Sequence, residues 1–544
     1  MGDPVAELRS AVEAAASTLR DGGEAGKSHP TLERPPKPEF GDYSTNAAML
    51  LAPALGEKPR GTAEKLAAEL GKSLEGSLEK VEVAGPGFLN LFLSDDWYRR
   101  SAGELASQGE RLGRPPRADE TAERVNVEFV SANPTGPITA AGGRGAALGD
   151  SIARVLEFCG HPVTREYYVN DRGGQIDRFA ASIAARMKGE PVPEEGYEGD
   201  YVAEIGESLE QEGVDPDDLD AIGRRGIAQM VAAAEVTLRR YDIVFDIWSS
   251  ERSMHESGAV ERALGEAREA GHVYESEGAT WLRTTSFGDD KDRVLIRSDG
   301  DSTYFLSDIA YHRDKLDRGS DRLIDVLGAD HHGYVERLRA GLAALGYDPD
   351  ALEVAIMQLV HVVEGGERAQ MSKRSGEFVT LDELIDDIGA DAARFFMLQR
   401  SHDTTVDLDL ELARKTSNEN PVYYVQYAHA RIASILRKAG EGAEERAAVD
   451  FAALPVEPSE RALIKRLCEL PDEVTETAER RAPHRLCAYA MEVGRDFHAF
   501  YRDCQVVGAE GEGVEESRLG LCLLTKRTIA RTLGLLGISA PERM

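Results

Sequence analysis

Residues 124–145 read RVNVEFVSANPTGPITAAGGRG and combine three local signals in a row. Residues 124–130 are rich in β-branched and aromatic side chains, which favours a strand. Residues 131–139 include two prolines and a glycine, which indicates a loop. The glycines that follow begin a helical pattern that ends at Gly160. A strand, a glycine-bearing turn and a helix in this order predict the opening unit of a doubly wound parallel sheet.

Strands and helices continue to alternate beyond this unit, as a doubly wound sheet requires. Residues 162–169 predict the second strand, because β-branched and aromatic residues predominate there. Residues 194–239 read as mostly helical and are interpreted as an insertion. Further strands are expected at residues 294–297, 323–327 and 354–359. We therefore expect an α/β catalytic domain with insertions over residues 111–415.

A smaller unit is predicted on each side of this domain. Residues 1–110 combine helical patterns with a short apolar strand at 87–92, which predicts a small α+β domain. The polar residues 111–124, which include two prolines, read as a linker. Apolar side chains then recur at helical spacing to the end of the chain, which predicts an all-α helix bundle over residues 416–544.

The composition is that of a globular chain with several cores. Its 544 residues exceed what one hydrophobic core supports, and 42% are hydrophobic. No apolar run reaches the ~18–20 residues that span a bilayer, and the first residues lack the apolar segment of a secretory signal. The five cysteines never occur as C-x-x-C, which disfavours a disulfide framework or a structural zinc site and favours a reducing cytoplasm.

The formal net charge of −33 would by itself disfavour a nucleic-acid partner, because an acidic surface repels phosphates. The charge is uneven, however. Residues 1–419 carry 47 Lys and Arg against 78 Asp and Glu, whereas residues 420–544 carry 17 against 19. The C-terminal unit is therefore close to neutral and remains a candidate nucleic-acid surface. We interpret the acidic remainder as a solvated surface, since no block of like charge forms a tail.

Two loops have the composition of phosphate-binding sites. The loop 131–145 follows a strand and leads into a helix N-terminus, where free backbone N–H groups and the helix dipole favour an anion. The loop QMSKRSG at residues 370–376 carries adjacent cations and a glycine. A lysine in such a loop can reach the β- and γ-phosphates of ATP as charge builds on leaving pyrophosphate. No G-x-G-x-x-G is present, which disfavours a dinucleotide-dependent oxidoreductase.

Several strings together resemble the arginyl-tRNA synthetases, a family of class I aminoacyl-tRNA synthetases. Three lie in the catalytic domain: SANPTGP at 131–137, MSKR at 371–374 and GADAAR at 389–394. Two resemble the family's N-terminal domain: GDYSTN at 41–46 and PGFLN at 86–90. Others resemble its insertions, amino-acid pocket, anticodon helix and C-terminal ending: YEGDY at 197–201, FDIW at 245–248, TYFLSDIAYH at 303–312, YVQYAHAR at 424–431 and PERM at 541–544. Their order and spacing cover nearly the whole chain.

The resemblance implies arginine–tRNA ligase activity on a Rossmann-like class I fold. L-Arginine and ATP, accompanied by Mg²⁺, would give arginyl-adenylate and pyrophosphate, in a step for which the family needs tRNA. The arginyl group would then pass to the 3′-terminal adenosine of arginine-specific tRNA with release of AMP. Residues 1–110 and 416–544 would bind this tRNA. We expect a cytoplasmic monomer with no membrane partner and no structural zinc.

The chemistry of a guanidinium agrees with this implication. The group is planar and permanently charged, so a pocket for it needs carboxylates and aromatic faces. Glu128 and Asp308 can supply charge, and Tyr304 can supply a stacking or hydroxyl contact. By resemblance, Asn133 holds the α-amino end of arginine, and Ser131 belongs to the same pocket. Without the resemblance, Glu128 reads as a polar strand position and Asp308 as an acid on a helix surface.

The resemblance also carries ATP- and tRNA-binding roles to individual positions. The expected ATP-binding residues are Pro134, Thr135, Gly136, Pro137, Thr139, Gly142, Gly143, His331, His332, Met371, Ser372 and Lys373. The expected tRNA-binding residues are Phe88, Asn90, Tyr424, Tyr427, Arg431 and Met544. The two adjacent histidines lack the spacing and partners of a zinc site, so we expect no metal bound by the protein there.

One motif departs from the family pattern. The first loop of the family carries H-x-G-H, whereas positions 139–142 read TAAG, and the first lysine of K-M-S-K is Gln370. We expect the Thr139 hydroxyl, the amides at the helix start and the Arg144 guanidinium to replace the lost donors. Thr139, Arg144 and Lys373 are therefore the expected catalytic residues. Two alternatives stay open: a non-catalytic or repurposed tRNA-binding paralogue, and a class I synthetase for another amino acid.

Overall fold

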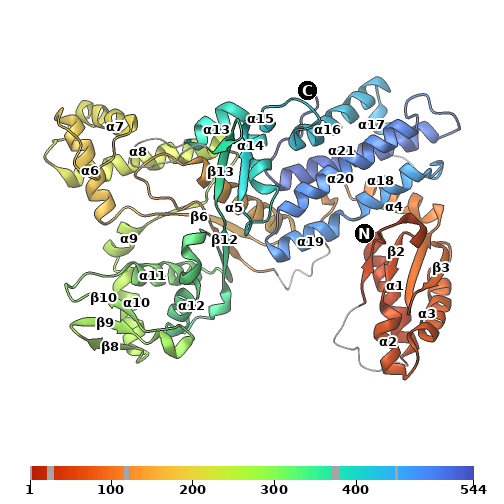
Figure 1. Cartoon of the computed structure of the whole chain (residues 1–544), viewed down its shortest axis with the longest axis horizontal. Coiled ribbons are helices and arrows are strands. Elements are labelled where there is room, and N and C mark those ends of the chain that lie inside the picture. The colour runs from red at the N-terminus through yellow and green to blue at the C-terminus, as the bar shows by residue number, and fades with distance from the viewer. Residues whose placement is uncertain (1–2, 21–29, 116–121, 369–378, 448–450) are drawn as a thin grey trace.

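The computed structural model describes residues 3–20, 30–115, 122–368, 379–447 and 451–544. Three units follow one another along the chain around a central parallel sheet (Figure 1). The N-terminal unit and the C-terminal helices lie on one side of this sheet, and two insertions of the central domain lie on the other (Figure 1). This arrangement confirms the predicted fold class: an α/β catalytic domain, a small α+β domain and an all-α bundle.

The N-terminal unit is a four-stranded antiparallel sheet packed with helices, in the strand order β1-β2-β4-β3. Asp3 begins the first helix, because its carboxylate accepts the N–H groups of Val5 and Ala6 at 3.0 Å. The elements are α1 (Pro4–Leu19), β1 (Leu32–Glu33), β2 (Tyr43–Thr45), α2 (Ala47–Leu55), α3 (Pro59–Ser73), β3 (Leu78–Ala84), β4 (Phe88–Leu93) and α4 (Asp95–Ser107).

Five parallel strands form the central sheet in the order β12-β11-β5-β6-β7. Their bounds are β5 (Val125–Glu128), β6 (Val163–Val169), β7 (Ile247–Ser250), β11 (Arg322–Gly328) and β12 (Leu352–Met357). Val125 and Val127 on the central strand are buried, as expected for a parallel sheet covered on both faces. The sheet confirms the strands predicted around residues 125, 165, 325 and 355, and adds β7.

The strand order reverses between β5 and β11. From β5 the chain adds β6 and then β7 on one side, whereas β11 and β12 lie on the other. In an open parallel sheet, ligands bind outside the carboxyl ends of the strands at such a switch point. Glu128 ends β5 and pairs in register with Asp325 on β11, so both residues lie near this edge.

Helix α5 (Ala140–Phe158) connects β5 to β6 and confirms the helix predicted from the glycine-bearing turn. Thr139 caps it, because its Oγ1 accepts the Gly142 N–H at 3.1 Å. Gly149 lets the helix approach the sheet, since a Cβ at this position would lie only 2.2 Å from the Phe129 ring. The helix therefore runs from the switch point across the buried face of the sheet.

Two insertions interrupt the domain. The first is helical, as predicted, and contains α6 (Gly174–Met187), α7 (Asp200–Gln211) and α8 (Leu219–Arg240). The second contains α9 (Glu251–Glu256), α10 (Ala259–Glu269), β8 (Val273–Ser276), β9 (Ala279–Leu282) and β10 (Arg293–Ile296). The strand expected at residues 294–297 exists as β10, but it pairs antiparallel with β9 in a separate three-stranded sheet. A short apolar run predicts a strand without specifying its partner, because pairing depends on tertiary contacts.

The rest of the central domain surrounds the switch point. Helix α11 (Tyr304–Asp317) precedes β11, and α12 (Val335–Ala344) precedes β12. Thr303 caps α11, with its hydroxyl accepting the Leu306 N–H. The remaining elements are β13 (Val360–Glu364), β14 (Glu367–Arg368), α13 (Leu381–Ile388), α14 (Ala390–Leu398), β15 (Val406–Asp409) and α15 (Leu410–Ala413).

The C-terminal unit is the predicted helix bundle. It consists of α16 (Pro421–Lys438), α17 (Ala443–Arg446), α18 (Pro458–Cys468), α19 (Leu470–Arg480), α20 (His484–Asp503) and α21 (Val514–Leu535). Asn420 caps α16, and Lys465 on α18 donates to Asp42 Oδ1 at 3.1 Å, which joins the bundle to the N-terminal unit. Within the described residues, no helix combines the length and apolar character that crossing a bilayer requires.

Candidate active site

A cavity of about 690 Å³ lies at the switch point between β5 and β11. Its walls come from the loop after β5, the end of β6, the starts of α9 and α11, and the turn after β11. Carboxylates and tyrosines predominate among the side chains that line it: Glu128, Glu251, Asp308, Asp325, Asp330, Tyr168, Tyr304, Tyr311 and Tyr334. Carboxylates beside aromatic faces are the groups that pair with a planar cation.

A buried ionic network forms the floor of this cavity. The Lys315 ammonium, which is fully buried, donates to Glu128 Oε2 and, at 3.1 Å, to Asp325 Oδ1. His312 Nε2 lies 2.7 Å from Asp325 Oδ2, and its Nδ1 lies 2.7 Å from the Asp308 carbonyl oxygen. Both ring nitrogens of His312 therefore face acceptors, which favours the imidazolium. Two carboxylates and two cations then make the network neutral.

The pKa shifts in the network follow from this geometry. Burial alone would lower the pKa of Lys315, but the carboxylates of Asp325 and Glu128 raise it overall. Burial would likewise lower the pKa of His312, and the Asp325 carboxylate raises it overall. Burial would raise the pKa of Asp325, yet the charges of Lys315 and His312 keep it below its ordinary value. The geometry therefore favours the charged form of each of these three groups.

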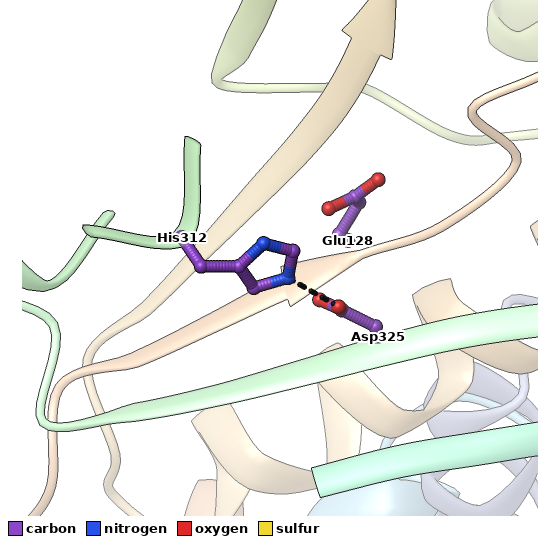
Figure 2. Close-up of side chains that lie close together, drawn as sticks. All are labelled: Glu128, His312 and Asp325. Carbon is purple, nitrogen blue, oxygen red and sulfur yellow. Dashed lines mark hydrogen bonds and ion pairs between the residues drawn. The ribbon is translucent and has the colours of Figure 1, made fainter. Parts of the chain in front are cut away.

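Glu128, His312 and Asp325 also have the residue types of a metal site, and Figure 2 shows them converging at the end of the sheet. One ligand atom from each lies within 4.8 Å of the others. However, the Lys315 ammonium bonds to both Glu128 and Asp325, so it already supplies the positive charge that a cation would bring. The chemistry of this set therefore fits an ionic network better than a metal centre.

Two other carboxylates in the cavity have no such compensation. Asp308 lies on α11, and burial raises its pKa to about 6 although the Tyr334 hydroxyl donates to it. Glu251 is the first residue of α9 and is 4% exposed. Its pKa is raised mainly by burial and also by the nearby charge of Asp308. Among the described residues, neither carboxylate forms a direct ion pair with a Lys or Arg. The charge of Arg172, which lines the same cavity, offsets only part of the rise in the pKa of Glu251. A cation that entered the cavity would relieve both carboxylates at once.

The structure brings together the residues predicted for arginine but changes one role. Ser131 donates to Glu128 Oε1 at 2.8 Å, and Asn133 and Tyr304 line the same cavity. Tyr304 is 61% exposed and stands at the entrance. Glu128 differs from expectation, because its carboxylate pairs with Lys315 instead of being left free for a guanidinium. Asp308 remains available, as predicted.

A second cavity of about 630 Å³ adjoins the first and shares Gly328 and Asp330 with it. It lies at the N-terminus of α5, where Ala141 lines it, and is otherwise bounded by the end of β12, β13 and Arg368. His331 is an exposed residue in the turn beside the shared wall, while the side chain of His332 lies outside the described set. Adjoining cavities of this size suit two substrates that react with each other.

The donors expected around the TAAG positions are arranged differently from the prediction. The Gly142 N–H donates to Thr139 Oγ1, and the Gly143 N–H donates to the Thr139 carbonyl at 3.1 Å. Arg144 is 1% exposed, and its guanidinium donates to the carbonyl oxygens of Gln358 and Ser401 at 2.9 and 2.8 Å. Burial lowers its pKa to about 10. The placements of Arg144 and of the two amides disagree with roles as phosphate donors, because their N–H groups are already used to hold α5. The Thr139 hydroxyl only accepts a hydrogen bond there, so its own hydrogen remains available to donate.

The end of the loop after β5 is hydrogen-bonded to the segment that leads into α13. The Ala140 N–H donates to the Val379 carbonyl at 2.9 Å, and the Leu381 N–H donates to the Ile138 carbonyl at 2.8 Å. Thr380, between these partners, begins α13 with the predicted capping box. Met371, Ser372 and Lys373 lie outside the described residues. Among the described residues, Val379–Leu381 therefore lie beside the N-terminus of α5.

The predicted tRNA-binding residues of the bundle form an aromatic and cationic surface. Tyr427 lies parallel to Tyr423 at 6.1 Å, and Arg431 donates to the Tyr427 hydroxyl at 2.8 Å. The Arg431 guanidinium lies over the Tyr501 ring at 4.6 Å. Tyr424 is held more deeply, because its hydroxyl is 3.0 Å from His498 Nδ1. Met544 is 54% exposed at the end of the chain.

The two residues of the N-terminal unit that were predicted to contact tRNA differ in their exposure. Phe88 is 39% exposed at the start of β4, as a binding residue would be. Asn90 is only 6% exposed, and its Oδ1 accepts the Ser44 hydroxyl at 3.0 Å. The expectation that Asn90 contacts tRNA therefore disagrees with its position inside the sheet. Side chains alternate along a strand, so residues 88 and 90 lie on the same face of β4. Phe88 is the first residue of the strand and is more exposed than Asn90, which lies inside it.

Several groups that shape the site were not predicted from the sequence. Glu251 follows the string FDIW by only three residues, and this proximity was the available signal. Tyr168 lies in a predicted strand and Lys315 in a predicted helix, where a polar residue normally reads as solvent-facing. Their importance depends on what lies opposite them in the fold.

Three family models match the chain. The model described as "Arginyl tRNA synthetase N terminal domain" matches residues 6–93, and "tRNA synthetases class I (R), catalytic domain" matches residues 107–195 and 207–434. The model described as "DALR anticodon binding domain" matches residues 425–544. The three matches follow the order of the three units of the fold.

Whole-length comparisons agree with these matches. The arginine–tRNA ligase of Desulforudis audaxviator is 46% identical over 558 residues, covering 99% of this chain and 97% of the relative. That of Bacillus subtilis is 44% identical over 526 residues, covering 94% of both. The solved structure of Thermus thermophilus arginyl-tRNA synthetase has a TM-score of 0.76 at 26% identity and covers 99% of each chain. The chain therefore belongs to the arginyl-tRNA synthetase family of class I aminoacyl-tRNA synthetases.

Proposed function

We propose that this protein is an arginine–tRNA ligase that activates L-arginine with ATP in the two adjoining cavities and transfers it to arginine-specific tRNA. One observation carries the choice of amino acid: Asp308 and Glu251 face the same cavity without a Lys or Arg partner in the described chain. A guanidinium can bond both carboxylates at once through its fixed fork of N–H donors. An apolar side chain would leave both carboxylates unpaired, which is strongly unfavourable.

ATP is proposed to bind in the second cavity, with its phosphates toward residues 134–137 and the start of α5. It enters as its magnesium complex, so Mg²⁺ comes with the substrate. The Thr139 oxygen already accepts a hydrogen bond from Gly142, which leaves its hydroxyl hydrogen free to donate to a phosphate oxygen. Lys373 would meet the pyrophosphate as charge builds on it. The arginine carboxylate attacks the α-phosphate, and the adenylate then passes its arginyl group to the terminal ribose of tRNA.

The tRNA is proposed to contact residues 1–110 and 416–544, with residues 111–415 carrying the chemistry. The surface of Tyr427 and Arg431 suits unstacked anticodon bases, because a base can stack on a tyrosine ring and an arginine can pair with phosphate. The near-neutral charge of the bundle within a −33 chain supports this placement. We further propose a monomer that acts in the cytoplasm.

The direct test is aminoacylation of total tRNA with each of the twenty amino acids and the purified full-length chain. Arginine alone is expected to be charged, with pyrophosphate released in equal amount. Charging of another amino acid would overturn the assignment of the cavity. Binding of tRNA without formation of any adenylate would instead indicate a non-catalytic paralogue.

Replacing Lys373 with alanine is expected to lower kcat for arginine activation about 100-fold or more with a smaller change in the KM for ATP. A group that meets charge developing in the transition state contributes mainly to kcat, and a lost donor of this kind costs ~2.7–4 kcal/mol. Pyrophosphate exchange measured in the presence of tRNA reports both constants. Lys415→Ala, on an exposed lysine, is the control. An unchanged kcat would remove Lys373 from the mechanism.

The KM for arginine is expected to rise as the pH falls below about 6. The pKa of Asp308 is raised to about 6, so below this pH the free protein carries a neutral carboxyl that cannot pair with a guanidinium. Each further unit of pH should raise KM up to about tenfold, because the ionised fraction falls by that factor. Steady-state measurements from pH 5 to 8 check the profile. A flat profile would contradict the role of Asp308.

Replacing Tyr427 with alanine is expected to weaken tRNA binding about 5- to 100-fold, since base–aromatic stacking contributes ~1–3 kcal/mol per base. Tyr427→Phe keeps the ring and loses only the hydrogen bond with Arg431, so it is the matched control. Filter binding gives the affinity, and thermal unfolding reports the fold. Wild-type affinity together with a large fall in Tm would mean that Tyr427 is only a packing residue.

A further inference from the structure

The loop that links the two cavities begins with strained backbone. Val130 and Ser131 have φ values of 68° and 40°, in the left-handed region that non-glycine residues rarely occupy. A β-branched residue such as Val130 is especially unfavourable there. Such backbone persists only where the surrounding structure holds it, and it concentrates at functional loops. The loop of residues 131–137 therefore depends on partners outside itself.

Two tyrosine hydroxyls act as such partners. Tyr167 on β6 donates to the carbonyl oxygen of Ala132 at 3.1 Å, and Tyr201 on α7 donates to that of Thr135 at 2.8 Å. Ala132 lines the first cavity, whereas Thr135 comes four residues before Thr139, the residue that caps α5. The two hydroxyls therefore hold two parts of one loop: one beside the first cavity, and one in the stretch that leads to α5.

The Tyr167 hydroxyl is fixed by a buried aromatic cluster. The residue is 2% exposed, and its ring stacks on Trp248 with a centroid distance of 4.4 Å and an interplanar angle of 22°. The ring edge of Phe245 closes the other side at 5.4 Å. A ring held on both sides keeps its hydroxyl aimed at one carbonyl.

The Tyr201 hydroxyl is fixed from the first insertion. Its ring lies 6.4 Å from Phe179 at an angle of 26°. A Cβ on Gly199 would lie 2.4 Å from this ring, and a Cβ on Gly136 would lie 3.2 Å from its hydroxyl oxygen. Glycine at both positions thus makes room for the contact. The catalytic family model matches residues 107–195 and 207–434, so Tyr201 belongs to a segment outside the matched ranges.

We propose that Tyr167 and Tyr201 are positioning residues for arginine activation, each for a different substrate. Tyr167 holds Ala132 so that the neighbouring Asn133 faces arginine, and Tyr201 holds Thr135 so that residues 134–137 face ATP. The inference rests on the proposed function and extends it, since neither tyrosine touches a reacting atom. In this proposal, the hydrogen bond from Tyr201 to Thr135 makes the first insertion part of the ATP site.

The test uses three variants of the full-length chain that each remove a single hydroxyl: Tyr201→Phe, Tyr167→Phe and Tyr197→Phe. Tyr197 is the matched control, because its ring packs on the same Phe179 at 5.5 Å and its hydroxyl makes no hydrogen bond within the described residues. Arginine-dependent pyrophosphate exchange in the presence of tRNA gives kcat and both KM values. Thermal unfolding is measured on the same samples.

The expected result is a split between the two substrates. Tyr201→Phe should raise the KM for ATP about 5- to 10-fold and leave the KM for arginine within about twofold, as loss of one neutral hydrogen bond allows. Tyr167→Phe should do the reverse. Tyr197→Phe should match the wild type in every constant, and all three Tm values should stay close to that of the wild type.

Two outcomes would overturn the inference. The first is that Tyr201→Phe gives the same constants as the control Tyr197→Phe. The second is that the KM for ATP and the KM for arginine change equally in Tyr201→Phe or in Tyr167→Phe, which would indicate a general loosening of the loop. Failure of the proposed function is a separate result, because the wild-type chain would then show no arginine-dependent exchange. In that case calorimetric titration of ATP and arginine into the same variants decides the inference, with the same split expected.

Discussion

The Asp308→Asn variant is expected to raise the KM for arginine by roughly 30-fold to more than 1000-fold while leaving the KM for ATP almost unchanged. Truncating one partner of a desolvated charged pair costs ~2–5 kcal/mol, and each 1.4 kcal/mol is a factor of about ten. Asp308 is half-buried in the first cavity and forms no ion pair with a Lys or Arg among the described residues. A bound guanidinium would therefore be its direct cationic partner. Asparagine keeps the shape and removes only the charge.

The matched control for this variant is Asp314→Asn. Asp314 lies on the same helix, two turns away, and its carboxylate pairs with Arg318 at 2.7 Å on the surface. This variant should leave both KM values unchanged, because exposed pairs contribute little. The pH dependence of arginine binding should also weaken in Asp308→Asn, where only Glu251 is left to titrate, and persist in full in the control. If the KM for arginine in Asp308→Asn stays within about twofold of wild type, Asp308 does not bind the guanidinium.

The Lys315→Met variant is expected to destabilise the catalytic domain by ~3–5 kcal/mol, because it leaves buried carboxylates without their cation. Glu128 and Asp325 both bond to this ammonium, which has no exposed surface. Methionine keeps an unbranched side chain only one heavy atom shorter, so the loss is chiefly electrostatic. Urea unfolding should show the effect as a lower midpoint for the first transition, with the transition of the bundle unchanged.

A double variant separates the charge effect from packing. Adding Glu128→Gln to Lys315→Met removes one of the stranded charges, so stability should partly return. Lys526→Met is the control on the bundle, where the ammonium pairs with the exposed carboxylates of Glu444 and Glu542 and should contribute less than about 1 kcal/mol. If the double variant were less stable than Lys315→Met, the network would not be held by charge compensation.

Local patterns in the sequence were sufficient for the architecture. The strand at residues 125–128 and the helix that begins at Ala140 follow from side-chain composition and a glycine-bearing turn, which act over a few residues. The all-α character of residues 416–544 follows from apolar spacing in the same way. The resemblance of short strings identified the family before any contact was known, and Asp308 was found through it.

Only the tertiary structure decided which groups each polar side chain contacts. Arg144 and Asp308 both lie on helices, yet one is buried against the carbonyls of Gln358 and Ser401 and the other opens into a cavity. Periodicity gives the face of a helix on which a residue lies, but it does not give what is packed opposite that face.

The same reason explains the roles of Glu128 and Lys315. They are 187 residues apart in the chain, and only the parallel pairing of β5 with β11 and the packing of α11 bring them together. That contact places Glu128, a predicted guanidinium ligand, in an ion pair with Lys315. Asp308 and Glu251 line the same cavity and form no ion pair with a Lys or Arg among the described residues. The sequence by itself determined the fold class, the family and a few residues of the cavity, among them Glu128, Asn133 and Asp308. Only the fold determined which of the carboxylates there carry an uncompensated charge, because compensation depends on distances that no local pattern encodes.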